Sequence, residues 1–320
     1  VIAFQMMSKL STRTAMFAVI VFVLPHAMGM VVNSRTFEGT EGIKIGMIQP
    51  NISQSIKWDR SKVSEIQDRL ISQTQSLFNS GAMLVFWPES SVPSLIKAGL
   101  NNSTIDRAKE IIPFDRALVA GLMYKDNGRY YNSAAMIDST GITDIYSKVQ
   151  LVPIAERVPL SGLFPSLSNM NIGAGSFSKG EELKVLSYND IAFGTMICFE
   201  SIFPYLSSEF AAKDAGFLVY LVNDGWYETS PEPAQHFNHS KIRAIETRRS
   251  VARVTNRGIS AVINEYGEVE DRIDEYIDGT ILATISPITY KTFYTKFGNL
   301  FAKLCMLATL VLLCISLRRK

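Results

Sequence analysis

The middle of the chain alternates short apolar runs with longer amphipathic stretches. The runs at 83–87 and 217–223 are continuously apolar, as is typical of strands that are buried on both faces. Between 62 and 79, apolar residues recur at helical spacing behind a cap at Asp59 or Ser61. Together these patterns predict strands at 43–49, 83–87, 117–124, 132–138, 143–148, 191–198, 217–223, 251–255 and 260–263, and helices at 62–79 and 235–249. Strands alternating with helices indicate an α/β layer fold with mixed sheets, and leave the strand order open.

Both ends of the chain are far more apolar than its middle. Residues 14–32 carry no charge and are about as long as a helix that crosses the hydrocarbon core of a membrane. Residues 297–317 contain one charge, Lys303, which lies close enough to the helix start to reach the headgroups. A secretory signal peptide is the alternative for the first stretch, but no clear cleavage site follows it. We therefore expect two membrane spans.

Positive charge flanks both apolar stretches on their outer sides. The charged residues are Lys9, Arg13, Arg318, Arg319 and Lys320. By the positive-inside rule, both ends of the chain face the cytoplasm and the middle lies on the far side of the membrane. We accordingly divide the chain into 1–33, a cytoplasmic end and first span; 43–290, a catalytic domain; and 297–320, a second span and basic tail. A formal net charge of +2 over 320 residues gives no reason to expect a nucleic-acid partner.

Reactive side chains follow three of the predicted strands. Glu89 comes just after the strand at 83–87, Lys148 ends the strand at 143–148, and Cys198 ends the strand at 191–198. In open α/β sheets this edge is where ligands bind. A carboxylate can take the proton of a thiol, and a fixed ammonium can stabilise the oxyanion that forms when the thiol attacks a carbonyl. Taken singly, each residue is more often structural or solvated.

The remaining cysteines and the histidines narrow the chemistry. Cys305 and Cys314 lie in the second apolar stretch, so Cys198 is the only cysteine of the predicted catalytic domain. The chain has three histidines, one of them in the first apolar stretch, which leaves little material for a Cys–His or Ser–His dyad. Glutamate, lysine and cysteine form a complete acyl-transfer set without histidine, metal or cofactor.

The local sequence around these residues resembles the nitrilase superfamily, whose signature is a Glu-Lys-Cys triad. Within it, the resemblance to the apolipoprotein N-acyltransferase family is closer and covers about 43–290. It rests on IGMIQPNISQSIKWD (45–59), VFWPESSVP (85–93), YNSAAMIDSTGITDIYSKVQLVPIAERVPL (131–160), ICFESIFP (197–204) and the stretch from NDGW to SAVI (223–263). The resemblance implies a nitrilase-like αββα sandwich flanked by transmembrane helices.

The resemblance also implies roles for individual residues. Glu89 is the general base, Lys148 stabilises the oxyanion and Cys198 is the nucleophile. Further residues near the triad or the substrate are Glu156, Trp58, Glu200, Phe199 and Trp226.

The function that the resemblance implies is lipoprotein maturation. An acyl chain passes from a membrane phospholipid, through a thioester on Cys198, to the N-terminal amine of the diacylglyceryl-cysteine of an apolipoprotein. The expected location is the inner membrane of a bacterium, with the catalytic domain on the periplasmic side. Two alternatives stay open: a nitrilase-type amidohydrolase that gives the acyl group to water, and an inactive homologue that serves as a membrane-bound binding module.

Overall fold

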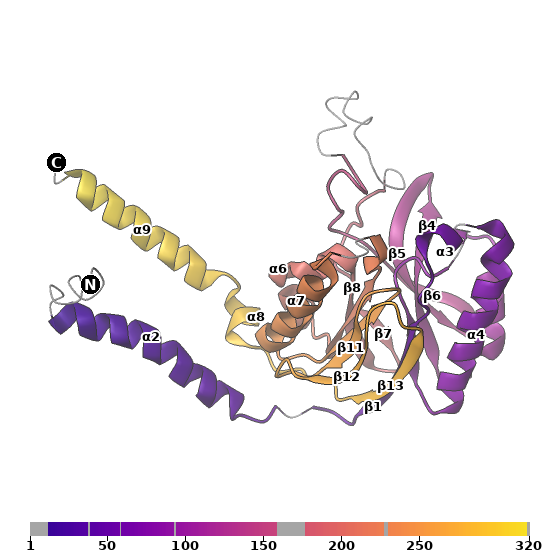
Figure 1. Cartoon of the computed structure of the whole chain (residues 1–320), viewed down its shortest axis with the longest axis horizontal. Helices are drawn as coiled ribbons and strands as arrows, with labels where there is room; N and C mark the ends of the chain where they lie inside the picture. Colours follow the sequence, from indigo (N-terminus) through magenta and orange to yellow (C-terminus); the bar gives the residue numbers. More distant parts are fainter. Residues whose placement is uncertain are drawn as a thin grey trace. The chain divides into compact units, whose positions relative to one another are not determined.

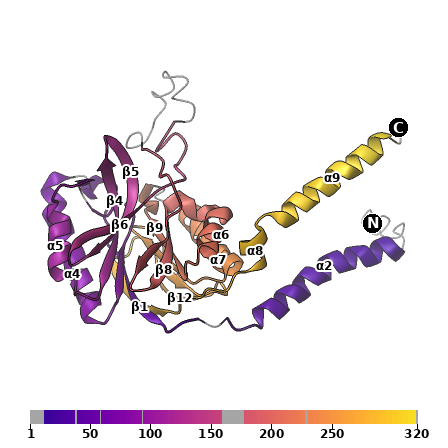
Figure 2. The same cartoon turned by 180° about the vertical axis from the view of Figure 1, so that it is seen from behind.

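The computed structural model describes residues 12–37, 39–57, 59–92, 94–158, 177–226 and 230–318. The chain divides into two compact units, Val1–Glu38 and Gly39–Lys320. In the first unit, α2 (Thr12–Asn33) is a helix of 22 residues with Pro25 inside it. The second unit holds the two β-sheets and the remaining helices (Figures 1 and 2).

The first sheet is built mainly from the N-terminal half of the second unit. Its strands are β1 (Ile43–Gln49), β2 (Leu84–Trp87), β3 (Leu95–Lys97), β4 (Ala117–Asp126), β5 (Arg129–Asp138), β6 (Gly141–Ser147) and β13 (Gly279–Ile285). They lie in the order β13-β1-β2-β4-β5-β6, and β3 pairs with β4. β1, β2 and β4 run parallel, whereas β4, β5 and β6 form an antiparallel meander. The sheet is therefore mixed, as the sequence predicted.

The second sheet comes from the later part of the chain. Its strands are β7 (Leu186–Tyr188), β8 (Ile191–Ile197), β9 (Phe217–Val222), β10 (Val251–Thr255), β11 (Ser260–Ile263) and β12 (Val269–Ile273), in the order β12-β11-β10-β9-β8-β7. β8, β9 and β10 run parallel to one another. Because parallel strands end at the same edge, the residues that follow β8 and β9 are brought together.

Helices cover the outer face of each sheet. α4 (Val63–Asn79) and α5 (Ser103–Ile111) lie against the first sheet, and α6 (Pro204–Ala212) and α7 (Glu232–Thr247) against the second (Figures 1 and 2). The shorter helices are α3 (Gln54–Lys57), η1 (Arg60–Lys62), η3 (Cys198–Ile202), η4 (Asp224–Trp226) and α8 (Phe293–Phe297), and α9 (Leu300–Arg318) follows α8. The described residues thus form an αββα sandwich, as expected.

Alternation along β2 shows how one strand serves two cores. Leu84 and Phe86 point between the sheets, whereas Val85 and Trp87 point toward the outer helices. All four side chains are fully buried, which explains why the run has no polar position. The indole N–H of Trp87 donates to Thr74 of α4 at 2.8 Å, so the one polar atom of the run has a partner.

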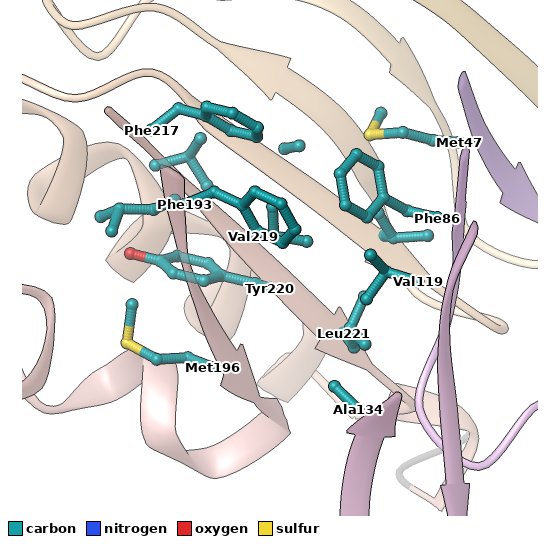
Figure 3. Packing of buried hydrophobic residues seen from close by; sticks show 14 of the residues in the cluster. Met47, Phe86, Val119, Ala134, Phe193, Met196, Phe217, Val219, Tyr220 and Leu221 are labelled. Carbon is teal, nitrogen blue, oxygen red and sulfur yellow. The ribbon is translucent and has the colours of Figure 1, made fainter. Parts of the chain in front are cut away.

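The core between the sheets is rich in aromatic and aliphatic side chains (Figure 3). Phe86 of the first sheet meets Phe193 of the second edge to face, with ring centroids 5.8 Å apart. Phe193 in turn stacks on Phe217 at 5.3 Å. Full burial of one such side chain contributes roughly 1.5–3 kcal/mol, so this core fixes the sheets against each other.

One helix of the described chain is apolar and long enough to cross a membrane. This helix is α9 (Leu300–Arg318), and none of its apolar window is buried. The expected first span forms a helix, α2, but its apolar stretch over the described residues, Val19–Asn33, is shorter than a membrane span. The expected N-terminal membrane span therefore stays a prediction.

Candidate active site

The two sheets bring Glu89 and Lys148 into one buried site with the strand end that carries Cys198. Glu89 follows β2, Lys148 follows β6, and Cys198 follows β8 of the other sheet. Lys148 Nζ lies 3.6 Å from Glu89 Oε1, and these two residues are 1% and 7% exposed. The Glu200 carboxylate accepts the N–H of the residue after Lys148 and the N–H of the residue before Cys198, so it holds these two segments together. The structure therefore juxtaposes the three residues that the sequence singled out.

Two glycines allow the backbone to close around this site. A Cβ on Gly121 of β4 would overlap the backbone of Pro88 and come within 2.7 Å of the Glu89 Cα atom. A Cβ on Gly180 would overlap the carbonyl of Ser147, and the Gly180 N–H donates to the carbonyl oxygen of Lys148 at 2.8 Å. Both the Glu89 turn and the end of β6 thus lie against backbone that has no room for a side chain.

A second carboxylate, Glu156, also contacts Lys148. Its Oε1 is 3.0 Å from Lys148 Nζ, and its Oε2 accepts the N–H of Val152 at 2.8 Å. The Asn132 amide donates to both Glu89 Oε1, at 2.7 Å, and Glu156 Oε1, at 2.9 Å. One amide and one ammonium therefore hold two carboxylates that would otherwise repel each other.

Burial and mutual charge set the protonation of the three central groups. Burial raises the pKa of Glu89, and the charge of Lys148 offsets this only in part. Burial alone lowers the pKa of Lys148, but the negative charges of Glu89 and Glu156, and of Cys198 once it is a thiolate, outweigh burial and raise the pKa. Burial and the Glu89 charge raise the pKa of the Cys198 thiol well above its usual value. The resting site thus holds a thiol beside a proton acceptor and a lasting positive charge.

Cys198 directly follows β8 and begins η3 in a strained turn. Its φ of 50° lies in the left-handed region, which non-glycine residues adopt at a cost. Glu200, fully buried, holds this turn: its carboxylate accepts the N–H of Ile197 at 2.8 Å, the N–H groups of Val149 and Gln150 at 2.7 and 3.0 Å, and the Tyr146 hydroxyl at 2.9 Å. Glu200 therefore ties the backbone after Lys148 to the backbone before Cys198.

The remaining residues expected near the site differ in placement. Phe199 is half-buried and packs edge to face on Phe203, with ring centroids 5.0 Å apart. Trp226 ends η4 and is 61% exposed, free to contact a ligand from the surface. Trp58 lies outside the described residues.

Lys57 is a site residue that the sequence reasoning missed. It is 4% exposed, and its Nζ lies 3.3 Å from the backbone oxygen of Glu89. Burial lowers the pKa of Lys57 to about 8, against the opposing charge of Glu89. Its signal was its position directly before Trp58, in a segment already expected to reach the site. A second cation therefore faces the Glu89 turn.

A buried Ser–His–Asp chain also adjoins Cys198, and it corrects an expectation drawn from the histidine count. Ser201 Oγ lies 2.7 Å from His236 Nε2, and His236 Nδ1 lies 2.9 Å from Asp224 Oδ1. Asp224 follows β9 at the same edge as Cys198, a strand end that the sequence analysis did not single out. The expectation that the domain holds little material for a Ser–His pair is wrong, because few histidines do not prevent one of them from lying at the site.

Two members of this Ser–His–Asp chain also belong to a group of side chains that could bind a cation. Within the described residues, Asp224, Glu232 and His236 place possible ligand atoms within 4.8 Å of one another. However, the Arg253 guanidinium donates to Asp224 Oδ2 at 2.8 Å, and the second ring nitrogen of His236 faces Ser201. A fixed positive charge at this position opposes a metal ion, so we interpret the group as a hydrogen-bonded chain.

Comparison with protein families supports the resemblance seen in the motifs. The model of the carbon-nitrogen hydrolase family matches residues 44–293. Similar curated proteins include the apolipoprotein N-acyltransferase of Geobacter metallireducens, 30% identical over 88% of this chain and 55% of its own length. That of Chlorobaculum tepidum is 28% identical over 98% of this chain and 64% of its own length. The chain thus spans little more than half the length of the curated relatives that it matches.

Solved structures with the same fold are more distant in sequence. Nit3 of Saccharomyces cerevisiae, a member of branch 10 of the nitrilase superfamily, has a TM-score of 0.60 at 17% identity, covering 79% of this chain and 93% of its own. An amidase from a Nesterenkonia species has a TM-score of 0.57 at 18% identity, covering 80% and 95%. At this identity the likeness shows a nitrilase-like fold and nothing finer.

Proposed function

The chain belongs to the carbon-nitrogen hydrolase family, and on that premise we propose that it is an acyltransferase of lipoprotein maturation. It moves an acyl chain from a membrane phospholipid to the N-terminal amine of the diacylglyceryl-cysteine of an apolipoprotein. A thioester on Cys198 carries the acyl chain between the two substrates. The curated relatives at 28–30% identity bear the name of this activity, which supports the choice of acceptor.

One observation carries the chemistry: a buried carboxylate and a buried ammonium lie 3.6 Å apart, and Glu200 ties the backbone after Lys148 to the backbone before Cys198. In the first half-reaction, the Cys198 sulfur attacks the ester carbonyl while Glu89 takes the thiol proton. Because the pKa of the thiol is raised, proton transfer accompanies attack rather than preceding it. Lys148 stabilises the oxyanion, and the C–O bond then breaks. Glu89 returns the proton to the departing lysophospholipid oxygen.

The second half-reaction reuses the same groups. The free amine of the acceptor attacks the thioester carbonyl, and Glu89 takes a proton from the attacking nitrogen. Lys148 again faces the oxyanion, the C–S bond breaks, and Cys198 leaves as a thiol with the proton from Glu89. The product is an amide, and the acyl chain has passed through one site twice, as ping-pong kinetics require.

Membrane attachment fits substrates that are themselves anchored in lipid. α9 is long and apolar enough to span the bilayer, and basic residues follow it. We place the catalytic domain on the periplasmic side of a bacterial inner membrane, because positive charge flanks both apolar stretches on the outer sides. A tethered domain meets a phospholipid donor and a lipoprotein acceptor in the same membrane surface.

The test is acyl loading of the purified full chain with phospholipid alone. Intact-protein mass spectrometry should find one acyl group on Cys198, released by neutral hydroxylamine as expected for a thioester. An acceptor with a free diacylglyceryl-cysteine amine should discharge it into an amide. Release to water at the same rate with or without acceptor would identify an amidohydrolase instead, and no adduct at all would point to an inactive binding module.

Two variants show where the acyl group resides. Cys198→Ser should load far more slowly, because an alkoxide is much harder to form near neutral pH than a thiolate. The double variant Cys305→Ala/Cys314→Ala, which changes only the cysteines of α9, should load normally. An adduct that maps to α9 would remove Cys198 from its proposed role.

A further inference from the structure

The carbonyl oxygen of Cys198 is contacted by two buried side chains outside the Glu-Lys-Cys set. Ser201 Oγ lies 2.8 Å from it, and His236 Nε2 lies 3.2 Å from it. Ser201 comes from η3 and is fully buried, whereas His236 comes from α7 and is 4% exposed. These contacts act on the left-handed turn that carries the thiol. The acyl-transfer steps above use neither side chain.

Asp224, at the other end of the Ser201–His236–Asp224 chain, fixes the position of one ring proton of His236. Asp224 Oδ1 lies 2.9 Å from His236 Nδ1, and Asp224 Oδ2 accepts from Arg253 at 2.8 Å. Burial would raise the pKa of Asp224, but Arg253 and His236 outweigh it and hold the pKa below its usual value. Asp224 is therefore ionised and can only accept hydrogen bonds. His236 Nδ1 must then carry a proton.

The other ring nitrogen decides how the remaining protons are shared. Ser201 Oγ lies 2.7 Å from His236 Nε2 and 2.8 Å from the Cys198 oxygen, but a hydroxyl has one proton. If the ring is neutral, Nε2 is a hydrogen-bond acceptor. The Ser201 hydroxyl proton can then be donated either to Nε2 or to the Cys198 oxygen, but not fully to both. If the ring is protonated, Nε2–H donates to Ser201 Oγ and the hydroxyl donates to Cys198. The charged ring satisfies every polar atom of the chain, and the neutral ring does not.

We propose that the Asp224–His236–Ser201 chain positions the nucleophile, because the proton on His236 Nε2 decides whether the Cys198 carbonyl has a full side-chain hydrogen-bond donor beside the backbone bonding of η3. The importance of this device rests on the proposed function, in which Cys198 is the nucleophile. His236 and Ser201 act through the Cys198 backbone and are positioning residues. A turn that loses its donor relaxes from the left-handed conformation and carries the thiol away from Glu89 and Lys148.

Charged groups from each neighbouring element surround the ring of His236. Asp224 comes from η4 and Arg253 from β10, and η3 contributes the Cys198 carbonyl. Glu232, one turn earlier on α7, has Oε1 3.7 Å from Nδ1, and burial raises the pKa of this carboxyl to about 7. Burial and the Arg253 charge lower the pKa of His236, against Asp224. The ring therefore gains its second proton only below the usual titration range of histidine, about pH 6.5. The turn is held more firmly on the acid side.

The test measures thiol reactivity and needs no acyl donor. In the full chain with Cys305→Ala and Cys314→Ala, Cys198 is the only cysteine left. Its rate with 2,2′-dipyridyl disulfide, which reports thiols in acid, is followed from about pH 4 to about pH 8, on both sides of the ordinary histidine pKa. Besides the titration of the thiol, we expect a second inflection below about pH 6.5. Across it, reactivity should fall by roughly 5-fold as pH rises, the worth of about one hydrogen bond.

Variants assign that inflection. His236→Gln keeps an N–H that can reach Ser201 but cannot titrate, so the inflection should disappear. His239→Gln changes the histidine three residues along the same helix and should keep it. Ser201→Ala removes the shared hydroxyl, so the carbonyl then depends on the ring alone and the inflection should grow. Because only a protonated ring can donate directly at 3.2 Å, a purely structural role for Ser201 would not produce this change.

The outcomes separate this inference from the proposed function. An unchanged profile in His236→Gln, or an inflection abolished in Ser201→Ala, would overturn the inference. Ser201→Ala also keeps the test decisive if His236→Gln does not fold. A chain with the expected profile that never loads an acyl group would count against acyl transfer and leave the positioning of Cys198 intact.

Discussion

Glu200 accepts the backbone N–H of Ile197 at 2.8 Å, so a side chain that follows Cys198 holds the peptide group that precedes it. The same carboxylate accepts the N–H groups of Val149 and Gln150, which follow Lys148. One buried anion therefore fixes the relative placement of the thiol and the ammonium. The two lie 50 positions apart in the sequence and on different sheets.

Replacing this anion by an amide should loosen the site. In Glu200→Gln, one carboxylate oxygen becomes an NH₂ group, which cannot accept from a buried N–H. Leaving such a donor without a partner destabilises a fold by about 1–3 kcal/mol. We expect a lower urea midpoint and slower loading of Cys198. The exposed Glu182→Gln is the control, and an equal midpoint for both variants would contradict the role given to Glu200.

Glu89→Gln and Lys148→Met test the proposed base and the proposed oxyanion group. The glutamine keeps the shape but cannot accept the proton, and the methionine keeps most of the stem but loses the charge. Each should lower turnover by roughly 100-fold or more. Because burial raises the pKa of Glu89, the acid limb of the wild-type pH profile should lie above about 4.3, the value of a free glutamate. Near-normal turnover at equal amounts of folded protein would refute the assignment.

Lys57 should leave a pH-dependent signature in stability. Its pKa is about 8 in the folded chain, because burial outweighs Glu89, and 10.5 without that environment. Between these values the unfolded chain binds more protons, so stability rises with pH across this window, by about 3 kcal/mol in total. Below about pH 8 the full cost of burying the charge remains.

The measurement is the thermal midpoint of wild type minus that of Lys57→Met, at about pH 7, below that window, and at about pH 10, near its upper end. The difference should become more positive at the higher pH, because only the wild type gains from losing the proton. Lys44→Met, an exposed lysine of β1, should show no such change. A flat difference for Lys57→Met would show that Lys57 is not buried as a charge.

The proposed orientation predicts which loop a membrane-impermeant reagent can reach. Asn127 is exposed in the turn between β4 and β5, so Asn127→Cys offers a thiol away from the site. In spheroplasts that carry this variant with its three native cysteines replaced, an impermeant maleimide should label the introduced thiol from the outer face, without permeabilisation of the membrane. A cysteine added after Lys320 should react only once the membrane is opened. The reverse pattern would place the domain in the cytoplasm.

Apolar patterning was sufficient to predict most of the central strands. β2, β4 and β9 are buried on both faces, so their sequences contain uninterrupted apolar runs. The helix α5 was missed because only Ile105 and Ala108 of its apolar positions, together with a threonine, are buried. Strand order could not be predicted, since β1 pairs with β13 across 230 to 242 positions and no local pattern records that pairing.

The site residues also separate into those that the sequence indicated and those that only the fold reveals. Strand ends and motifs indicated Glu89, Lys148 and Cys198, because each lies at or just after the end of a predicted strand. Asn132 lies inside β5 and bonds Glu89 across 43 positions, a contact that depends on the order of three strands. No spacing in the sequence reveals it. Polar residues inside predicted strands therefore merit attention when a site is expected nearby.

The packing of one sheet on the other has a consequence for chimaeras made between family members. The proposed base and cation are encoded before residue 150, and the thiol comes from a strand that begins at Ile191. A chimaera joining the first segment of one family member to the second segment of another would inherit its proton acceptor and its nucleophile from different parents. Its activity would then depend on how well the inner faces of the two sheets pack, for example at the contact between Phe86 and Phe193. Family members are therefore expected to exchange these halves poorly even when every reactive residue is present.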